Sequence, residues 1–271
     1  MTLLEVLRRA TGYLETHGSG SPRLDAEVLL AHVLGIRRLD LYLQFDRALE
    51  ESQLAPYREL TGRRARGEPV AYLTGHREFM ALDFTVTADV LVPNPDTEVL
   101  VQRAVEWGRL RGSGAIRFAD VGTGSGCIAV AVAHYLPEAT VDATDVSEAA
   151  LAVAAGNAER LGVAGRVRFL CGDLAEPLAG RYDAVLANLP YVVEGIALPA
   201  EVTAQPGVAL FGGAELVNRL LAAAPELLAP RGIALLEVDP AITGDLKIED
   251  FAGWKLLKDL GGRDRVLEAW I

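Results

Sequence analysis

"ADVGTGSGCIAVAVA", residues 119–133, sets the class of this protein, because it places a glycine-rich turn between an apolar run and a helix-forming run. Gly122, Gly124 and Gly126 alternate within the turn. Glycines let the backbone turn tightly and approach a ligand with no Cβ in the way. In open α/β sheets, ligands bind outside the carboxyl ends of the strands, and this turn follows such an end. We therefore expect a ligand at the turn.

Beyond the turn, the chain alternates between strand-like and helical patterns. Strands are expected within residues 116–124, 139–147, 166–173, 182–191 and 232–239. Helices are expected at 125–135 and 214–228, and a further helix is expected to end at residue 161. Such alternation predicts parallel strands joined by crossover helices, in an α/β sheet that is covered on both faces. The tail, residues 254–271, predicts two further strands around Gly261 and Gly262, so the sheet is expected to end in an antiparallel pair.

The residues before this domain follow a different pattern. Apolar side chains in residues 1–69 recur at helical spacing, and helices are expected to start after Thr2 and Ser21, with Pro22 at the first helical position. This predicts a small helical domain. Residues 70–93 alternate as extended chain does, which predicts a hairpin that links the helices to the domain of residues 94–271.

Composition excludes several classes of protein. Of the 271 residues, 51% are apolar and 23% charged, as in ordinary globular chains, and the net charge of −11 leaves no broad positive surface for long nucleic acids. Cys127 and Cys171 lie in apolar runs without metal-ligand spacing, so we expect buried thiols and no metal site. The N-terminal helix carries charges throughout, unlike a signal peptide or membrane span, which favours a cytoplasmic protein. Nothing demands an oligomer, and a monomer is expected.

Acidic residues follow the next two strands. Asp145 comes about twenty residues after the glycine turn, where a carboxylate can accept both ribose hydroxyls of an adenosine. Asp173 ends the following strand, and Leu174 beside it can contact an adenine ring. Each acid alone also fits a helix N-cap or a solvated loop charge. Three successive strand ends of the same kind favour a cofactor that contains adenosine.

The fourth strand ends in "NLPY", residues 188–191. No His or Lys stands with a carboxylate at a later strand end, which disfavours hydride transfer and a nicotinamide. The Asn188 side-chain oxygen and a backbone carbonyl fixed by Pro190 can hold both N–H bonds of a planar NH2 group, and so orient its nitrogen towards the methyl of S-adenosylmethionine. Tyr191 can stack on that group. The stretch also fits a plain turn with an exposed tyrosine.

Several stretches together resemble the HemK/PrmC family of class I S-adenosylmethionine-dependent methyltransferases. The resemblance covers nearly the whole chain and rests on "RRARGEPVAYLTGHREFMALDF", "VLVPNPDTE", "DVGTGSGCIA", "NLPY" and "QPGVALFGG". It implies methylation of the side-chain amide of the glutamine in the Gly-Gly-Gln motif of peptide chain release factors. It also implies a Rossmann-like, mostly parallel sheet with an antiparallel C-terminal strand, and an N-terminal helical domain that recognises the substrate.

The residue patterns and the resemblance together predict the site. The expected cofactor contacts are Gly122, Thr123, Gly124, Ser125, Gly126, Asp145, Asp173, Leu174 and Asn188. The expected glutamine contacts are Asn188, Leu189, Pro190 and Tyr191, of which Asn188, Pro190 and Tyr191 are the predicted catalytic residues.

Two positions depart from the family pattern and keep alternatives open. Leu189 stands where the family usually has proline, and Asn94 stands where its hairpin commonly carries arginine. The form Asn-Leu-Pro-Tyr also occurs in adenine N6-dimethyltransferases of ribosomal RNA, so an adenine N6-methyltransferase of rRNA or DNA is the alternative. An inactive cofactor-binding regulatory module is a further one. The acidic charge favours a release factor, rather than nucleic acid, as the direct substrate.

Overall fold

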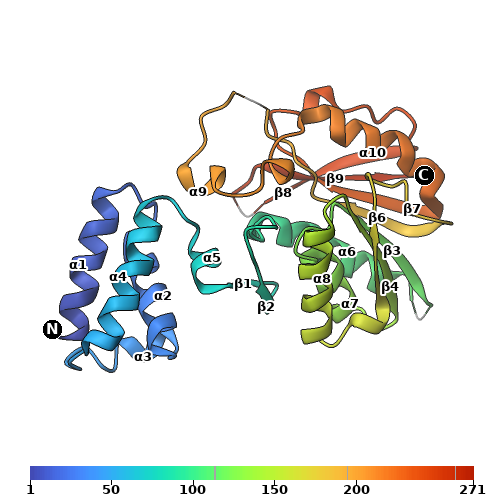
Figure 1. Cartoon of the computed structure of the whole chain (residues 1–271). Helices are drawn as coiled ribbons and strands as arrows, with labels where there is room; N and C mark the ends of the chain where they lie inside the picture. The colour runs from blue at the N-terminus through green and yellow to red at the C-terminus, as the bar shows by residue number, and fades with distance from the viewer. Residues whose placement is uncertain (113, 194, 260) are drawn as a thin grey trace. The chain divides into compact units, whose positions relative to one another are not determined.

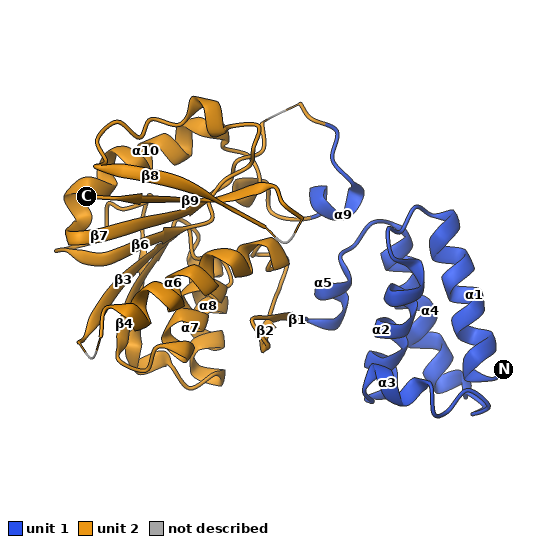
Figure 2. Cartoon of the chain, turned by 180° about the vertical axis from the view of Figure 1, so that it is seen from behind, with its two compact units in different colours: residues 1–76, 197–204 blue, residues 77–196, 205–271 orange. Residues whose placement is uncertain are grey.

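We describe the chain from a computed structural model, which covers residues 1–112, 114–193, 195–259 and 261–271. The chain divides into two compact units, coloured separately in Figure 2. Unit 1 comprises Met1–His76 and Ala197–Ala204, and unit 2 comprises Arg77–Ile196 and Gln205–Ile271. No helix in these described ranges is long and apolar enough to cross a lipid bilayer.

Unit 1 is helical (Figure 1). Its helices are α1 (Leu3–Thr16), α2 (Pro22–Leu34), α3 (Arg38–Leu41), α4 (Glu51–Ala65), α5 (Val70–Thr74) and α9 (Ala200–Thr203). Both predicted starts are confirmed: Thr2 forms a capping box with Glu5 at the start of α1, and α2 begins with Pro22. Buried Arg64 of α4 donates to Asp25 at 2.6 Å and to Glu201 at 2.5 Å, so an ion pair anchors α9 within this unit.

The predicted hairpin is shorter than expected. Residues 70–74, expected to be extended, form α5, and the hairpin consists of β1 (His76–Phe79) and β2 (Leu82–Thr85). Its two turn residues, Met80 and Ala81, have φ angles of 51° and 56°, which is uncommon outside glycine and asparagine. Two side chains of unit 2 hold this strained turn at Met80. Glu98 accepts from its N–H at 2.7 Å, and the Tyr135 hydroxyl donates to its carbonyl oxygen at 2.5 Å.

Unit 2 is built on a seven-stranded sheet with strand order β5-β4-β3-β6-β7-β9-β8. The strands are β3 (Ile116–Val121), β4 (Ala139–Asp145), β5 (Val167–Cys171), β6 (Tyr182–Ala187), β7 (Leu228–Glu237), β8 (Gly253–Lys258) and β9 (Asp264–Trp270). The first five are parallel to one another, whereas β9 is antiparallel to both β7 and β8. The predicted α/β sheet with an antiparallel C-terminal strand is therefore confirmed.

Helices cover both faces of this sheet. They are α6 (Glu98–Leu110), α7 (Cys127–Tyr135), α8 (Glu148–Arg160) and α10 (Gly213–Leu227), with short 3-10 turns η1 (Pro95–Thr97), η2 (Ala164–Arg166), η3 (Gly207–Ala209) and η4 (Thr243–Asp245). The sequence analysis predicted no helix at α6. The buried residues Leu100, Val101, Ala104 and Val105 recur at helical spacing along it. This apolar stripe is typical of an amphipathic helix and could have predicted α6 from the sequence.

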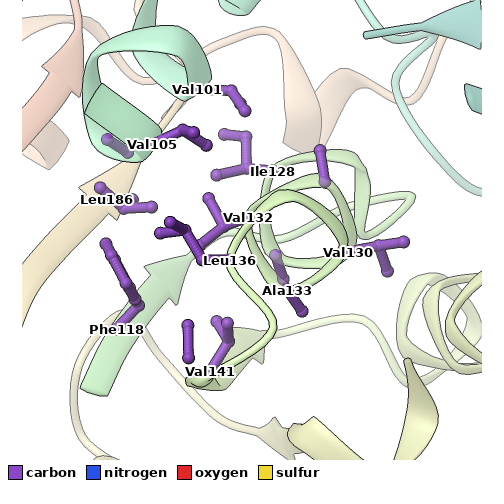
Figure 3. Packing of buried hydrophobic residues seen from close by; sticks show 14 of the residues in the cluster. Val101, Val105, Phe118, Ile128, Val130, Val132, Ala133, Leu136, Val141 and Leu186 are labelled. Carbon is purple, nitrogen blue, oxygen red and sulfur yellow. The ribbon is translucent and has the colours of Figure 1, made fainter. Parts of the chain in front are cut away.

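Alternate residues of the central strands enter two different cores, because both faces of the sheet are covered. Phe118 and Leu186 face the core formed with α6 and α7, whereas Val185 faces the core formed with α10. Figure 3 shows the first of these cores, with Ile128 and Val132 of α7 packed beside side chains of α6 and of the sheet. Each buried aliphatic side chain of this kind contributes about 1.5–3 kcal/mol.

One cysteine prediction is wrong. Cys127, at the start of α7, is buried as expected, but Cys171 is exposed. Cys171 ends β5, the edge strand of the sheet, and an edge strand has a neighbour on one side only.

The strand order also locates the ligand site. From β3 the chain proceeds outward through β4 to β5, and then returns to the other side of β3 as β6. The order therefore reverses between β3 and β6. In open α/β sheets, ligands bind at the carboxyl ends of the strands beside such a reversal.

Candidate active site

A cavity of about 440 Å³ lies at this switch point, within the range of small-molecule sites. Its lining includes ten of the predicted residues: Gly122, Thr123, Gly124, Ser125, Asp145, Asp173, Leu174, Asn188, Leu189 and Pro190. Residues that sequence reasoning did not single out also line it, among them Thr97, Ser147, Phe211 and Arg219. The predicted strand-end residues thus meet in one hollow of unit 2.

The three glycines of the turn serve different neighbours. All have positive φ, and a Cβ on Gly126 would lie 2.9 Å from the Cβ of Ala154 on α8, so Gly126 permits helix packing. A Cβ on Gly122 would lie 2.9 Å from the Leu189 side chain. A Cβ on Gly124 would have no atom within 4 Å among the described residues, so Gly124 is the glycine that leaves open space at the cavity.

Asp145 holds the turn and faces the cavity. One carboxylate oxygen accepts from the Gly124 N–H at 2.8 Å, and the other accepts from the Ser147 N–H at 2.9 Å. Each oxygen of an ionised carboxylate has a further lone pair. The half-buried side chain can therefore accept hydroxyl hydrogens of a ligand while it keeps its backbone contacts.

Asp173 and Leu174 lie at the neighbouring strand end. Asp173 forms an ion pair with Arg219 of α10 at 2.5 Å, a partner that no sequence pattern indicated. Leu174 has a φ of 48°, and its carbonyl oxygen accepts from the Thr144 hydroxyl at 2.7 Å. A non-glycine residue in this region stores strain that persists only where its surroundings enforce it. Here the Thr144 hydrogen bond holds Leu174 in the cavity wall.

A buried carboxyl supports the turn from inside the sheet. Asp120, the residue before Val121, accepts from the Thr123 hydroxyl at 2.6 Å and from the Ala129 N–H at 3.1 Å. Burial raises its pKa to about 7, although these two hydrogen bonds act to lower it. Its second carboxyl oxygen has no partner in the described part of the chain.

Asn188 also lines the cavity. It follows directly after β6 in the chain. Its Nδ2 donates to the Thr97 hydroxyl oxygen at 3.0 Å. Because the amide nitrogen is engaged there, the other branch of the amide, the acceptor Oδ1, is the one left for a ligand. Leu189, the next residue, is 3% exposed, and Pro190 also lines the cavity.

Tyr191 does not line the cavity, whereas the three residues before it do. It is half-buried against the α10-side core, and its hydroxyl donates to Glu237 at 3.4 Å. Tyr191 and Gly126 are the two predicted site residues that the cavity lining does not include. Burial raises the pKa of the Tyr191 hydroxyl, so this group stays protonated as a donor at neutral pH. Its predicted stacking on a substrate amide stays a prediction.

The stretch "QPGVALFGG", residues 205–213, braces the segment after Pro190. The Val192 N–H donates to the Leu210 carbonyl at 3.0 Å, and the Gly212 N–H donates back to Val192 at 3.2 Å. A Cβ on Gly212 would lie 2.5 Å from the Pro190 carbonyl oxygen, so only glycine fits at this close approach. The Gln205 side chain accepts from the Val92 N–H at 2.9 Å. This stretch therefore ties "NLPY" to the chain that follows the hairpin.

Asn94, where arginine was expected by resemblance, caps a turn. Its side-chain oxygen accepts from the Asp96 N–H at 3.1 Å at the start of η1, and the residue lines the cavity. The position thus contributes a neutral polar group and fixes the turn that carries Thr97.

Comparison with known proteins agrees with this geometry. Residues 5–75 match the PrmC N-terminal domain family, and residues 97–206 match the methyltransferase small domain family. The release factor glutamine methyltransferase of Moorella thermoacetica is 42% identical, with 100% of this chain and 99% of the relative covered. That of Rhodopirellula baltica is 41% identical, with 98% and 95% covered. The chain belongs to the release factor glutamine methyltransferases.

Solved structures show that the fold is shared more widely than this family. A Thermus thermophilus 16S rRNA N2 G1207 methyltransferase, in complex with AdoMet and guanosine, is similar with a TM-score of 0.55 at 19% identity, over 72% of this chain and 49% of that chain. A methyltransferase from Pyrococcus furiosus is similar with a TM-score of 0.52 at 21% identity, over 78% and 98%. Both likenesses concern the fold alone. The methyltransferase fold of this family member is thereby confirmed.

Proposed function

We propose that this chain transfers a methyl group from S-adenosylmethionine to the side-chain amide nitrogen of the Gly-Gly-Gln glutamine of peptide chain release factors. The observation that carries the proposal is the Asn188 amide, whose nitrogen is held by Thr97 at 3.0 Å so that its oxygen is left for a ligand in the cavity. Full-length relatives at about 40% identity that carry the name of this activity support it.

The residues around the glycine turn fit S-adenosylmethionine. The missing Cβ of Gly124 leaves room at the cavity, Asp145 can accept the ribose hydroxyls, and Leu174 can cover the adenine. The carboxylate of Asp173 lies at the same wall, paired with Arg219. When bound, this cofactor supplies an electron-poor methyl group.

Asn188 and Leu189, which follow β6, form a clamp for the substrate amide. An amide nitrogen is a poor nucleophile because its lone pair is delocalised. The Asn188 oxygen and the Leu189 carbonyl accept its two N–H bonds, orient the nitrogen and stabilise the positive charge that grows on it. The Leu189 side chain is buried against Gly122, so packing fixes this carbonyl where the family's usual proline ring would do so.

Charge supports a protein over a nucleic acid as the substrate. A protein that grips an RNA helix neutralises phosphates with clustered lysine and arginine. This chain has 26 Lys and Arg against 37 Asp and Glu, for a net charge of −11.

The test is a transfer assay with labelled S-adenosylmethionine and three substrates: a release factor, the same factor with its Gly-Gly-Gln glutamine replaced by asparagine, and naked rRNA. We expect label in the first substrate only. Asn188→Ala should lower turnover roughly a hundredfold to a thousandfold, because it removes one acceptor aimed at charge in the transition state. Calorimetry should show that this variant binds the cofactor as the parent does. Label in the rRNA, with the release factor untouched, would refute the proposal.

A further inference from the structure

A buried arginine is tied to the part of the sheet that carries the substrate clamp. Arg265 is the second residue of β9, and its side chain is 6% exposed. Its carbonyl oxygen accepts from the Val238 N–H at 2.8 Å. Two residues before Val238, Leu236 of β7 is paired with Ala187 of β6, and Ala187 directly precedes Asn188. The sheet therefore joins the backbone of Arg265 to the strand that carries Asn188.

Three carboxylates surround the Arg265 guanidinium. A buried cation is costly unless opposite charges compensate it. Among the described residues, Nη2 lies 3.1 Å from Asp96 and 3.7 Å from Asp259, and Nη1 lies 4.0 Å from Asp239. An exposed second cation, Arg263, approaches Asp96 at 3.4 Å. The shortest contact of the buried guanidinium is thus the one with Asp96.

Asp96 lies in η1, the turn that carries Thr97. The Asn94 side-chain oxygen accepts from the Asp96 N–H at 3.1 Å, and the Asn94 carbonyl accepts from the Thr97 N–H at 3.0 Å. These bonds shape the turn, but both lie within it, so they do not fix its place against the sheet. The ion pair between Asp96 and Arg265 joins the turn to β9 and supplies that anchor.

The turn in its anchored place meets the substrate clamp. Asn188 Nδ2 donates to the Thr97 hydroxyl oxygen at 3.0 Å. Both ends of this hydrogen bond are therefore held by one sheet, Asn188 through β6 and Thr97 through the ion pair to β9. Neither Asp96 nor Arg265 is among the described residues that line the cavity. These two side chains therefore act through the turn that they hold.

We infer that Arg265 is a positioning residue for methyl transfer, because its ion pair with Asp96 holds η1 in place. From that place Thr97 fixes the Asn188 amide with its oxygen towards the substrate. The inference rests on the proposed function. Without the ion pair, the turn loses its tie to β9 and the Thr97 hydroxyl moves relative to Asn188. A displacement of about 1 Å in groups that orient the reacting atoms can lower a rate about a hundredfold.

The test variant is Asp96→Ala. Asp96 is half-buried, and Arg265 keeps its other two carboxylates when Asp96 is removed. Arg265→Met would strip the cation from all three carboxylates and destabilise the fold, so Asp96→Ala is the cleaner change. We expect its turnover at saturating substrates to fall roughly tenfold to a hundredfold, while calorimetry shows the parent's cofactor affinity. Asp96→Glu keeps the carboxylate and should restore turnover close to the parent's.

Two controls change neighbouring charges. Arg263→Met removes the exposed cation near Asp96. Asp264→Ala removes a half-buried carboxylate next to Arg265 that pairs with Lys258 at 2.9 Å. Each should keep turnover close to the parent's, because neither removes the pair between Arg265 and Asp96.

Two measurements separate positioning from a general loss of stability. Asp96→Ala combined with Thr97→Val should lose no more turnover than Thr97→Val alone, because both changes act on one hydrogen bond. The side-chain NH2 signals of Asn188 in nuclear magnetic resonance spectra, assigned by their absence from Asn188→Ala, report on that bond without turnover. They should shift in Asp96→Ala and in Thr97→Val, and stay in place in Asp264→Ala.

The outcomes can be told apart. Asp96→Ala at the parent's turnover, Asp96→Glu as slow as Asp96→Ala, Arg263→Met as slow as Asp96→Ala, additive losses in the double variant, or unmoved Asn188 signals would overturn this inference, while the parent's activity upholds the function. A parent that leaves the release factor unmethylated would overturn the proposed function and this inference with it.

Discussion

The three glycines of the turn each allow a different close approach or open space. Gly126 makes room for α8 and Gly122 for Leu189, whereas Gly124 opens onto the cavity. The sequence predicted three glycines near a ligand, but it could not assign their neighbours, because those are Leu189, after β6, and Ala154 of α8, which are remote in the chain. Only the folded chain shows that Gly124 is the glycine with open space beside it at the cavity.

At Gly124, a valine should abolish binding of S-adenosylmethionine, because the branched side chain would fill the cavity at a φ of 54°. Gly162→Val is the matched control: its φ is 73°, and a Cβ there has no described atom within 4 Å, but it lies outside the cavity. Titration calorimetry should show parent-like affinity for the control. Thermal unfolding should show that the control has a lower melting temperature than the parent. A folded Gly124→Val variant of unchanged affinity would contradict this assignment.

Asp120 makes stability depend on pH. Burial raises its pKa from the ordinary 3.8 to about 7, so between these values the folded chain holds a proton that the unfolded chain has lost. Stability contributed by the protonated group is therefore lost as pH rises through about 7. Asp120→Asn keeps an oxygen for Thr123 and Ala129 and carries no charge. Scanning calorimetry should show that its melting temperature, relative to the parent, is higher at about pH 8 than at about pH 5; an equal difference would exclude this role.

At the scale of elements, the hairpin and the glycine turn are joined by one side chain. Buried Asn157 of α8 accepts from the Thr85 N–H at 2.8 Å, donates to the Thr85 carbonyl at 3.0 Å, and donates to the Ser125 carbonyl at 2.9 Å. It thus fastens β2 and the turn to one helix. No pattern in "AAGNAER" marks this asparagine as different from a surface one.

Asn157→Leu should destabilise the chain, because it leaves half-buried backbone groups of Thr85 and the buried carbonyl of Ser125 without their partner. Each such group costs about 1–3 kcal/mol. Asn218→Leu is the comparison, since Asn218 is half-buried and its side-chain hydrogen bonds to Asp245 and Lys247 are exposed to solvent. Urea unfolding followed by circular dichroism should show a clear loss for Asn157→Leu and a small one for Asn218→Leu. Equal stability of the two variants would show that the fastening is unimportant.

Element prediction succeeded where periodicity and turn chemistry act locally. The α/β alternation, the start of α1 at Thr2 and the final strand pair were all visible in the sequence. The hairpin turn was not, because Met80 and Ala81 lack the glycine or asparagine that a tight turn favours. Their conformation is enforced by Glu98 and Tyr135, which approach only in the folded unit. The same reason hides Thr97, Arg219 and Glu237 from sequence reasoning about the site.

At the scale of the whole molecule, the cavity and the N-terminal helices belong to different units. The cavity is lined by unit 2 residues, and unit 1 matches the PrmC N-terminal domain family over residues 5–75. We propose that unit 1 recognises the release factor. Hydrogen exchange on the full chain should show slower exchange in residues 1–76 when a release factor is added, and in residues 119–126 when the cofactor alone is added. Unchanged exchange in unit 1 with the release factor present would argue against this division.

The central claim is that the chain methylates a glutamine amide held by Asn188. The most direct measurement is tandem mass spectrometry of the release factor peptide that contains Gly-Gly-Gln, after incubation with S-adenosylmethionine and either the parent or Asn188→Ala. We predict one added methyl group, on the glutamine side-chain nitrogen, with the parent, and almost none in the same time with the variant. A methyl group on another residue of the peptide, or equal methylation by both proteins, would contradict the claim.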